Sequence, residues 1–162
     1  MRIVFMGTPE FAVPSLETLV EHGYPPTAVV TGPDRPRGRG QEMSPTPVKR
    51  AAQAHELPVL TPESVRSDSF AREIAELEPD CIVVVAFKIL PPRVFTQARR
   101  GAFNLHASLL PRYRGAAPIN RAIMDGAERT GVTTFFLEEH VDTGPIILQR
   151  EVEVGPNETA GE

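Results

Sequence analysis

The sequence predicts an α/β fold, with an open, mostly parallel twisted sheet and helices on both faces. Three apolar runs of strand length, at residues 2–6, 27–31 and 81–87, lack the polar alternation of a half-exposed strand. Segments with the spacing of amphipathic helices lie between them, and this alternation favours a parallel sheet with right-handed crossovers. A length of 162 residues suits one domain with a sizeable core.

Two helices are predicted in the first half of the chain, over residues 14–22 and 69–78. The apolar side chains that share one helical face are Leu16, Leu19 and Val20 in the first segment and Phe70, Ile74 and Leu77 in the second. The first helix therefore connects the strands 2–6 and 27–31, and the second leads into the strand 81–87.

Further elements follow in the second half. Residues 101–107 and 131–139 are predicted to be strands, and residues 118–126 a short helix between them, since Pro118 suits a first helical turn. A turn with the sequence Asp-Thr-Gly-Pro leads into the last predicted strand, residues 145–154.

Two segments depart from this regular pattern. Residues 32–47 are too rich in proline and glycine for a helix or strand, so we expect a functional loop there. The chain ends on Gly-Pro-Asn-Glu-Thr-Ala-Gly-Glu, where Asn157 or Thr159 would suit the cap of a further helix. We therefore expect residues 1–162 to form one domain that is truncated at its C-terminal end.

Composition excludes several classes of protein. No apolar run reaches the roughly 20 residues of a membrane span, and the N-terminal run is too short for a signal peptide, so we expect a cytoplasmic protein. The single cysteine, Cys81, cannot form an internal disulfide and is expected to be buried and inert. A net charge of -4 argues against general coating of nucleic acid, although a local basic patch remains compatible with it.

Three polar residues are candidates for catalysis. Asn104 and His106 lie at the end of a predicted strand, and their spacing of two directs both side chains to one face of the sheet. Asp142 lies in a tight turn after the next strand. Taken singly, the first two fit a turn cap and a packed histidine, and the aspartate fits an Asx turn. Together they supply an amide donor, a base and a carboxylate, which acyl transfer through a tetrahedral intermediate requires.

Four stretches together resemble the N-terminal catalytic domain of the methionyl-tRNA formyltransferase family. They are FNLHASLLPRYRGAAP, HVDTG, FMGTPEFAVPSLETL and TGPDRPRGRGQEMSPTPVK. The Asn-x-His, Ser-Leu-Leu-Pro and Asp-Thr-Gly elements are similar to those of the wider family of enzymes that use 10-formyltetrahydrofolate. The arginine-rich and Arg-Gly-Ala-Ala-Pro stretches narrow the resemblance to the tRNA enzymes. It covers the whole chain and implies a Rossmann-like formyltransferase fold.

The resemblance implies a role for each residue of the catalytic trio. Asn104 would stabilise the oxyanion, His106 would shuttle protons and Asp142 would orient the imidazole or a bridging water. The formyl donor would be 10-formyltetrahydrofolate, and no metal is expected. The segment implied to bind the folate is Ser108, Leu109, Leu110 and Pro111. A second wall is expected from residues 83–91, where this chain has Lys88 in place of the glycine common in the family.

The acceptor implied by the resemblance is initiator methionyl-tRNA. The arginines expected to contact its phosphates are Arg35, Arg37, Arg39, Arg112 and Arg114. A solvated flexible loop is the alternative for the first three, and a structural rim of the loop is the alternative for the last two. Gln41 and Glu42 stand where the family often has basic residues.

Two other functions stay open. The chain would transfer formyl to the amine of a sugar nucleotide or another small molecule, or it would only bind folate or RNA. The second, barrel-like tRNA-binding domain of the family is expected to be absent from these 162 residues. We accordingly expect a monomer that transfers formyl groups poorly by itself and retains some affinity for folate.

Overall fold

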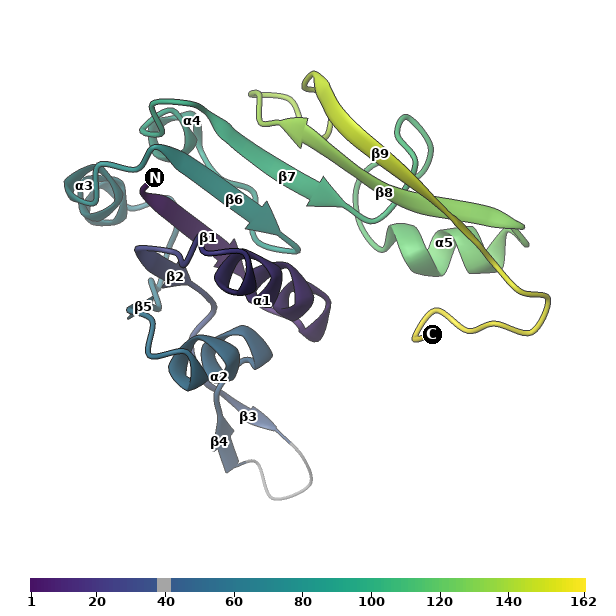
Figure 1. The fold of residues 1–162 in the computed structure, drawn as a ribbon, viewed down its shortest axis with the longest axis horizontal. Helices are drawn as coiled ribbons and strands as arrows, with labels where there is room; N and C mark the ends of the chain where they lie inside the picture. Colours follow the sequence, from purple (N-terminus) through teal and green to yellow (C-terminus); the bar gives the residue numbers. More distant parts are fainter. Residues whose placement is uncertain (38–41) are drawn as a thin grey trace. The chain divides into compact units, whose positions relative to one another are not determined.

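The computed structural model describes residues 1–37 and 42–162 of the chain. It divides into two compact units, Met1–Ala102 and Phe103–Glu162 (Figure 1). Unit 1 contains the parallel strands that the sequence predicts, and unit 2 contains an antiparallel set of strands.

The sheet of unit 1 is parallel throughout. Its central strand β1 (Ile3–Gly7) pairs with β2 (Ala28–Val30) on one side and with β6 (Cys81–Val85) on the other, and β2 pairs in turn with β5 (Val59–Leu60). All five residues of β1 are buried. The unbroken apolar runs therefore predicted three of these strands correctly, because strands covered on both faces need no polar alternation.

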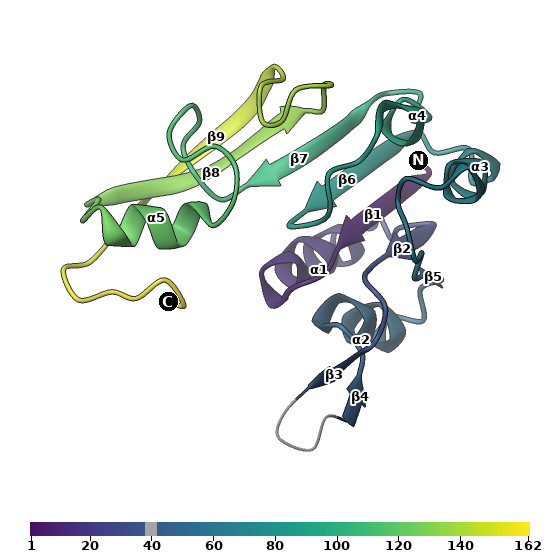
Figure 2. The same cartoon turned by 180° about the vertical axis from the view of Figure 1, so that it is seen from behind.

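Helices cover both faces of this sheet. In Figure 1 α1 (Val13–Glu21) lies in front of the strands, and in Figure 2 it lies behind them, whereas α3 (Asp68–Glu76) and α4 (Pro92–Phe95) are nearer the viewer in Figure 2. A 3-10 turn, Glu10–Ala12, precedes α1. The two predicted helices are confirmed, each within a residue or two of its expected bounds.

The helix α2 (Pro47–Ala54) is one that the sequence analysis did not predict. Its N-cap Thr46 accepts a hydrogen bond from the main-chain N–H of Lys49 at 3.0 Å, and Pro47 occupies the first helical position. Thr46 is buried, and its hydroxyl lies 2.7 Å from that of Thr31, at the end of β2. A threonine followed by proline is a readable signal for a helix start.

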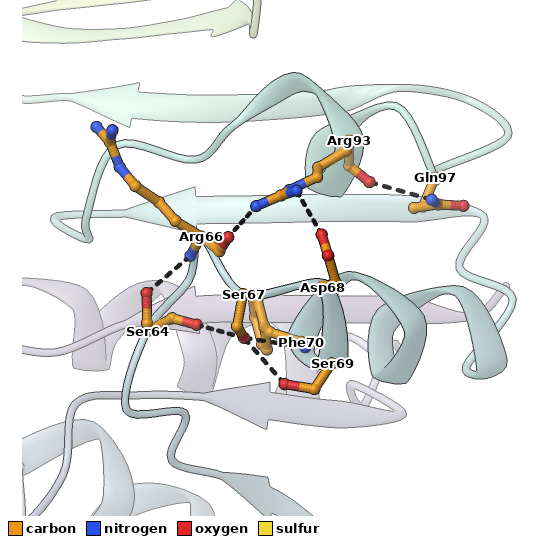
Figure 3. Close-up of polar contacts among 8 residues, drawn as sticks. All are labelled: Ser64, Arg66, Ser67, Asp68, Ser69, Phe70, Arg93 and Gln97. Atoms are coloured by element: carbon orange, nitrogen blue, oxygen red, sulfur yellow. Dashed lines mark hydrogen bonds and ion pairs between the residues drawn. The ribbon is translucent and has the colours of Figure 1, made fainter.

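Arg93 joins the two helices on the α3–α4 face. Its guanidinium donates to the Asp68 carboxylate in the first turn of α3 and to the main-chain carbonyl of Arg66 (Figure 3). Ser67 caps α3 by accepting the N–H of Phe70 at 3.2 Å. These contacts fasten the short helix α4 to the start of its longer neighbour.

The expectation of a plain loop over residues 32–47 is wrong in part. Residues Arg35–Arg37 (β3) and Glu42–Ser44 (β4) form a two-stranded antiparallel hairpin, in which Pro36 is opposite Met43. Both strands of such a ribbon have a free edge, so a proline without an N–H is tolerated there. Arg39 and Gln41 lie outside the described residues.

Asp80, just before β6, ties the N-terminus of the chain to the sheet. It accepts the main-chain N–H of Arg2 at 2.7 Å and the Nε–H of Arg99 at 3.0 Å, and these donors lower the pKa of its carboxyl. The adjacent Cys81 is half-buried rather than buried as expected. Burial raises the pKa of its thiol, and the Asp80 charge raises it further.

Unit 2 contains three long strands and one helix. They are β7 (Ala102–His106), of which only the first residue is assigned to unit 1, α5 (Pro118–Met124), β8 (Arg129–Phe136) and β9 (Ile146–Glu153). All four elements were predicted, with small differences at their ends. The strands pair antiparallel in the order β7–β8–β9 and lie side by side in both views (Figures 1 and 2).

The β8–β9 ladder contains one irregularity. Thr134 is opposite Leu148, but the next pair is Phe135 with Ile146, so Ile147 has no counterpart on β8. One extra residue on one strand is a β-bulge, which shifts the register by one position. On the C-terminal side of this bulge, Thr133 is opposite Gln149.

Among the residues that the structure describes, no helix is both long enough and apolar enough to cross a bilayer.

Candidate active site

The strand β7 carries two of the predicted catalytic residues. Asn104 and His106 lie two positions apart in it, which places them on one face, as predicted. Asn104 is half-buried, whereas only 7% of the His106 surface is exposed. In the β7–β8 ladder Asn104 is opposite Phe135 and His106 is opposite Thr133.

The hydrogen bonds of His106 define the tautomer of its ring. Nε2 lies 2.8 Å from the main-chain carbonyl of Tyr113, and a carbonyl can only accept, so Nε2 carries the proton. In the neutral ring, Nδ1 is then the nitrogen with a free lone pair. Nδ1 lies 3.8 Å from Oδ2 of Asp142, which is ion-pair distance but too long for a direct hydrogen bond.

Asp142 lies in the turn between β8 and β9 and is itself held in place. Its Oδ2 accepts the main-chain N–H of Gly115 at 2.9 Å, and its main-chain carbonyl accepts the Nε–H of Arg114 at 3.0 Å. The side chain is 9% exposed, and the backbone has a left-handed φ of 55°. The loop whose Tyr113 carbonyl accepts the Nε2–H of His106 therefore also holds Asp142 in place.

Gly144 makes this turn possible. A Cβ placed on Gly144 would collide with the main-chain carbonyl of Phe136, at the end of β8. The main chain of the turn thus approaches β8 more closely than any residue with a side chain allows. This close approach is the physical reason for the glycine in the Asp-Thr-Gly motif.

Residues 108–111 form the first part of the loop after β7, and their side chains differ in exposure. Ser108 and Leu110 are buried, and the Ser108 hydroxyl donates to the carbonyl of Arg112 at 2.6 Å. Leu109 is half-buried and packs against Gly131, where a Cβ would meet its Cδ2 atom at 2.7 Å. Pro111 is exposed. Only Leu109 and Pro111 of this segment thus present side-chain surface.

Thr133 and Gln149 are polar residues of this site that the sequence analysis missed. Thr133 is fully buried, and its hydroxyl donates to the carbonyl of Ser108 and accepts the N–H of Leu110. The Gln149 carboxamide donates to the Thr133 hydroxyl and to the Leu110 carbonyl. Only the antiparallel register identifies them, since neither belongs to a recognisable motif.

Unit 1 has a separate cavity of about 370 Å³ beyond the carboxyl ends of β1, β2 and β6. Its lining residues are Thr8, Pro9, Gly32, Pro33, Arg35, Ser44, Thr46, Ala86, Phe87 and Lys88. Lys88 is exposed at this cavity, and Arg35 is also exposed, so two cations border it. Ligands commonly bind at this end of a parallel sheet.

The five predicted arginines are divided between the two units. Arg35 and Arg37 lie in the hairpin strand β3 of unit 1, and Arg39 lies outside the described residues. In unit 2, the Arg112 guanidinium lies over the ring of Tyr113 at 5.5 Å, and Arg114 contacts Asp142 as described above. Arg112 therefore contacts a residue of its own loop, whereas Arg114 contacts the turn between β8 and β9.

Among the described residues, no group of three or more histidine, cysteine, aspartate or glutamate side chains is arranged to hold a metal ion.

The chain belongs to the formyl transferase family, whose model matches residues 1–162. It is similar to the methionyl-tRNA formyltransferase of Chlorobium luteolum, with 59% identity over 100% of this chain and 52% of the relative. It is also similar to that of Desulforamulus reducens, with 52% identity over 99% of this chain and 51% of the relative. The chain thus spans about half the length of the curated relatives it matches.

The fold is that of a solved phosphoribosylglycinamide formyltransferase from Bacillus halodurans. The two superpose with a TM-score of 0.79 over 99% of this chain and 84% of the other, at 20% identity. At this identity the likeness concerns the fold alone. It confirms the predicted α/β class with a mostly parallel sheet.

Proposed function

We propose that the protein transfers the formyl group of 10-formyltetrahydrofolate to the amino group of initiator methionyl-tRNA. The observation that carries the proposal is the packing of His106 against Asp142 beside Asn104, in a chain 59% identical to a methionyl-tRNA formyltransferase. The protein would act as a cytoplasmic monomer in the initiation of translation.

The reaction joins the amine nitrogen of methionine to the formyl carbon and breaks the bond from that carbon to N10 of the folate. As the first bond forms, the carbonyl electrons move onto oxygen, and they return when N10 leaves. The amine loses one proton and N10 gains one. The enzyme therefore has to stabilise an oxyanion and move one proton, and no net oxidation occurs.

His106 is the proposed proton carrier, acting through Nδ1. Because Nε2 donates to the Tyr113 carbonyl, Nδ1 is the nitrogen that can receive a proton. The 3.8 Å separation from Asp142 fits a relay in which one water carries the proton between the amine and this pair. Once Nδ1 is protonated, the carboxylate of Asp142 stabilises the imidazolium, and the low exposure of both groups strengthens that attraction.

Asn104 is the proposed oxyanion donor. It shares the face of β7 with His106, and it is half-buried, so its amide remains accessible to a substrate. One N–H directed at the oxyanion of a tetrahedral intermediate contributes about 3 kcal/mol to transition-state stabilisation.

The folate is proposed to contact the segment from Ser108 to Pro111. The exposed Pro111 and the half-buried Leu109 offer apolar surface to the pterin, whereas the buried side chains of Ser108 and Leu110 hold the segment in shape. In this proposal, Ser108 and Leu110 contribute to folate binding by fixing the shape of the segment, since their main-chain groups bond to Thr133 and Gln149.

Five arginines are proposed to bind tRNA phosphates. They are Arg35 and Arg37 of the hairpin, Arg39, which lies outside the described residues, and Arg112 and Arg114 of the loop after β7. Arg35, Arg112 and Arg114 are exposed. Guanidinium groups bind phosphate oxygens through two parallel hydrogen bonds.

The test compares formyl acceptors. The protein is mixed with 10-formyltetrahydrofolate and either charged initiator tRNA or amino-sugar nucleotides, and tetrahydrofolate release is followed. We expect turnover with methionyl-tRNA and none with the sugars. Formylation of a sugar amine without formylation of methionyl-tRNA would refute the proposal.

A further inference from the structure

A transverse row of three residues crosses the sheet of unit 2 at the site. His106 on β7 is opposite Thr133 on β8, and Thr133 is opposite Gln149 on β9. Directly opposed residues of neighbouring strands point to the same face. The imidazole of His106, the buried hydroxyl of Thr133 and the carboxamide of Gln149 therefore lie side by side on one face of the sheet.

The Thr133 hydroxyl has all its hydrogen-bonding capacity in use. It donates to the Ser108 carbonyl at 2.7 Å, and it accepts the Leu110 N–H at 3.1 Å and the Gln149 Nε2–H at 2.9 Å. A hydroxyl has one proton and two lone pairs, so these three bonds satisfy it completely. Two of the three connect it to the main chain of the loop that follows His106.

Gln149 holds the same loop from the other side. Its Nε2 group also donates to the Leu110 carbonyl at 2.9 Å, so both of its protons are used. The Leu110 main chain is thus held at its N–H by Thr133 and at its carbonyl by Gln149. A side chain without two donors at position 149 would leave the Leu110 carbonyl and the Thr133 lone pair without these partners.

After Leu110, the loop turns back towards His106. The Ser108 hydroxyl donates to the Arg112 carbonyl, and the Arg112 N–H donates to the Leu109 carbonyl at 3.0 Å. The next residue, Tyr113, presents the carbonyl that accepts the Nε2–H of His106. Thr133 and Gln149 therefore hold the loop in place. The carbonyl of Tyr113 at the end of this loop determines which nitrogen of His106 carries the proton.

We propose that Thr133 and Gln149 are positioning residues for formyl transfer, which hold the loop 108–113 so that His106 keeps its proton on Nε2 and its lone pair on Nδ1. This inference rests on the proposed function for its kinetic consequence. Its structural part, the tautomer, concerns the protein alone. The two residues act through the loop and need no contact with either substrate.

The test removes the donors while preserving side-chain volume. In Gln149→Leu and Gln149→Glu the carboxamide protons are lost, and in Thr133→Val the hydroxyl is lost. Glu151→Gln is the matched control, because Glu151 lies two residues further along β9 and its exposed ion pair with Arg129 has no bond to the loop. Thr133→Ser retains the hydroxyl and serves as the conservative variant.

Two readouts separate this inference from the proposed function. Nitrogen-15 NMR of the histidine ring reports the tautomer without any substrate, and we expect the Nε2–H form in the parent and in Glu151→Gln, with a mixture of forms in Gln149→Leu. In the formylation assay we expect kcat to fall about tenfold or more in Gln149→Leu, with KM for both substrates nearly unchanged, since misplacement of a reacting group costs rate rather than affinity. Thr133→Ser should restore most of what Thr133→Val loses.

The outcomes are decisive in either direction. An unchanged Nε2–H tautomer in folded Gln149→Leu and Gln149→Glu would overturn the inference, whatever the assay shows. If methionyl-tRNA proves not to be the acceptor, the proposed function fails while the NMR result still decides the tautomer question. If Gln149→Leu does not fold, Gln149→Glu and the Thr133→Ser and Thr133→Val pair carry the same comparison, and equal tautomer populations in all folded variants would again refute it.

Discussion

Oδ2 of Asp142 accepts the main-chain N–H of Gly115 at 2.9 Å and also faces Nδ1 of His106, at 3.8 Å. One oxygen thus serves both the architecture of the loop and the proposed proton carrier. An isosteric amide separates the two roles, since it keeps an acceptor for Gly115 but removes the charge that stabilises an imidazolium.

Asp142→Asn should therefore leave the fold intact and reduce formyl transfer. We expect kcat to fall at least about a hundredfold, which is the usual contribution of an acid–base relay. The thermal unfolding midpoint should change little. Glu139→Gln makes the same charge change at an exposed position of the same connection and should be neutral in both measurements. Near-normal turnover in Asp142→Asn would remove the carboxylate charge from the mechanism.

Gly144→Ala tests the close approach of the Asp142 turn to β8. The added Cβ meets the Phe136 carbonyl, so the turn has to move, and we expect a loss of about 1–3 kcal/mol in the free energy of unfolding. Formyl transfer should fall as well, because Asp142 moves with the turn. Gly155→Ala is the control, since its Cβ meets only Glu158 at ordinary contact distance. Equal stability of the two variants, measured by urea denaturation, would show that the turn accommodates the added methyl group without strain.

The lowered pKa of Asp80 makes a defined contribution to the pH dependence of stability. Because its folded pKa lies below the unfolded value, the ionised group stabilises the fold at neutral pH, and this contribution disappears as the pH falls from about 4 through the folded pKa. Asp80→Asn should thus cost stability at pH 7, and the cost should shrink towards pH 2.5. Denaturant unfolding of both proteins across this range measures the difference. If Asp80→Asn lost the same stability at every pH, the loss would come from packing and not from the charge of Asp80.

Charge reversal of the three arginines between residues 35 and 39 tests their proposed role in tRNA binding. The triple variant Arg35→Glu, Arg37→Glu and Arg39→Glu should raise the apparent KM for methionyl-tRNA more than that for the folate, and it should flatten the salt dependence of tRNA binding. Arg72→Glu, an exposed change on α3, should leave both constants nearly unaltered. An equal rise in the two KM values would argue against phosphate contacts from these arginines.

Much of unit 1 could be predicted from hydrophobic patterning alone. Strands such as β1 and β6 are buried on both faces and read as unbroken apolar runs. The hairpin β3–β4 was missed because proline and glycine usually exclude strands, whereas a two-stranded ribbon with free edges tolerates a proline such as Pro36. The helix α2 was missed because its eight residues are mostly polar or small, although its Thr46–Pro47 start was readable.

The candidate site could be predicted only in part, for a physical reason. Periodicity placed Asn104 and His106 on one face, since the residues are neighbours in the chain. Nothing local indicates that Asp142, 36 positions beyond His106, folds back against it, and family resemblance supplied that expectation. Thr133 and Gln149 depend on the antiparallel register, which the turn and the bulge determine and which sequence spacing does not reveal.

The bulge at Ile147 has a consequence for insertions and deletions in this strand. If Ile147 were paired with Thr134 instead of bulging, continuous pairing from Phe135 and Ile146 would bring Leu148 opposite Thr133 and turn Gln149 to the other face. Deleting Ile147 would instead remove the bulge and leave Leu148 opposite Thr134 and Gln149 opposite Thr133. A related sequence that lacks this position therefore retains the same row of side chains, whereas one that has a residue there retains the row only if that residue stays unpaired.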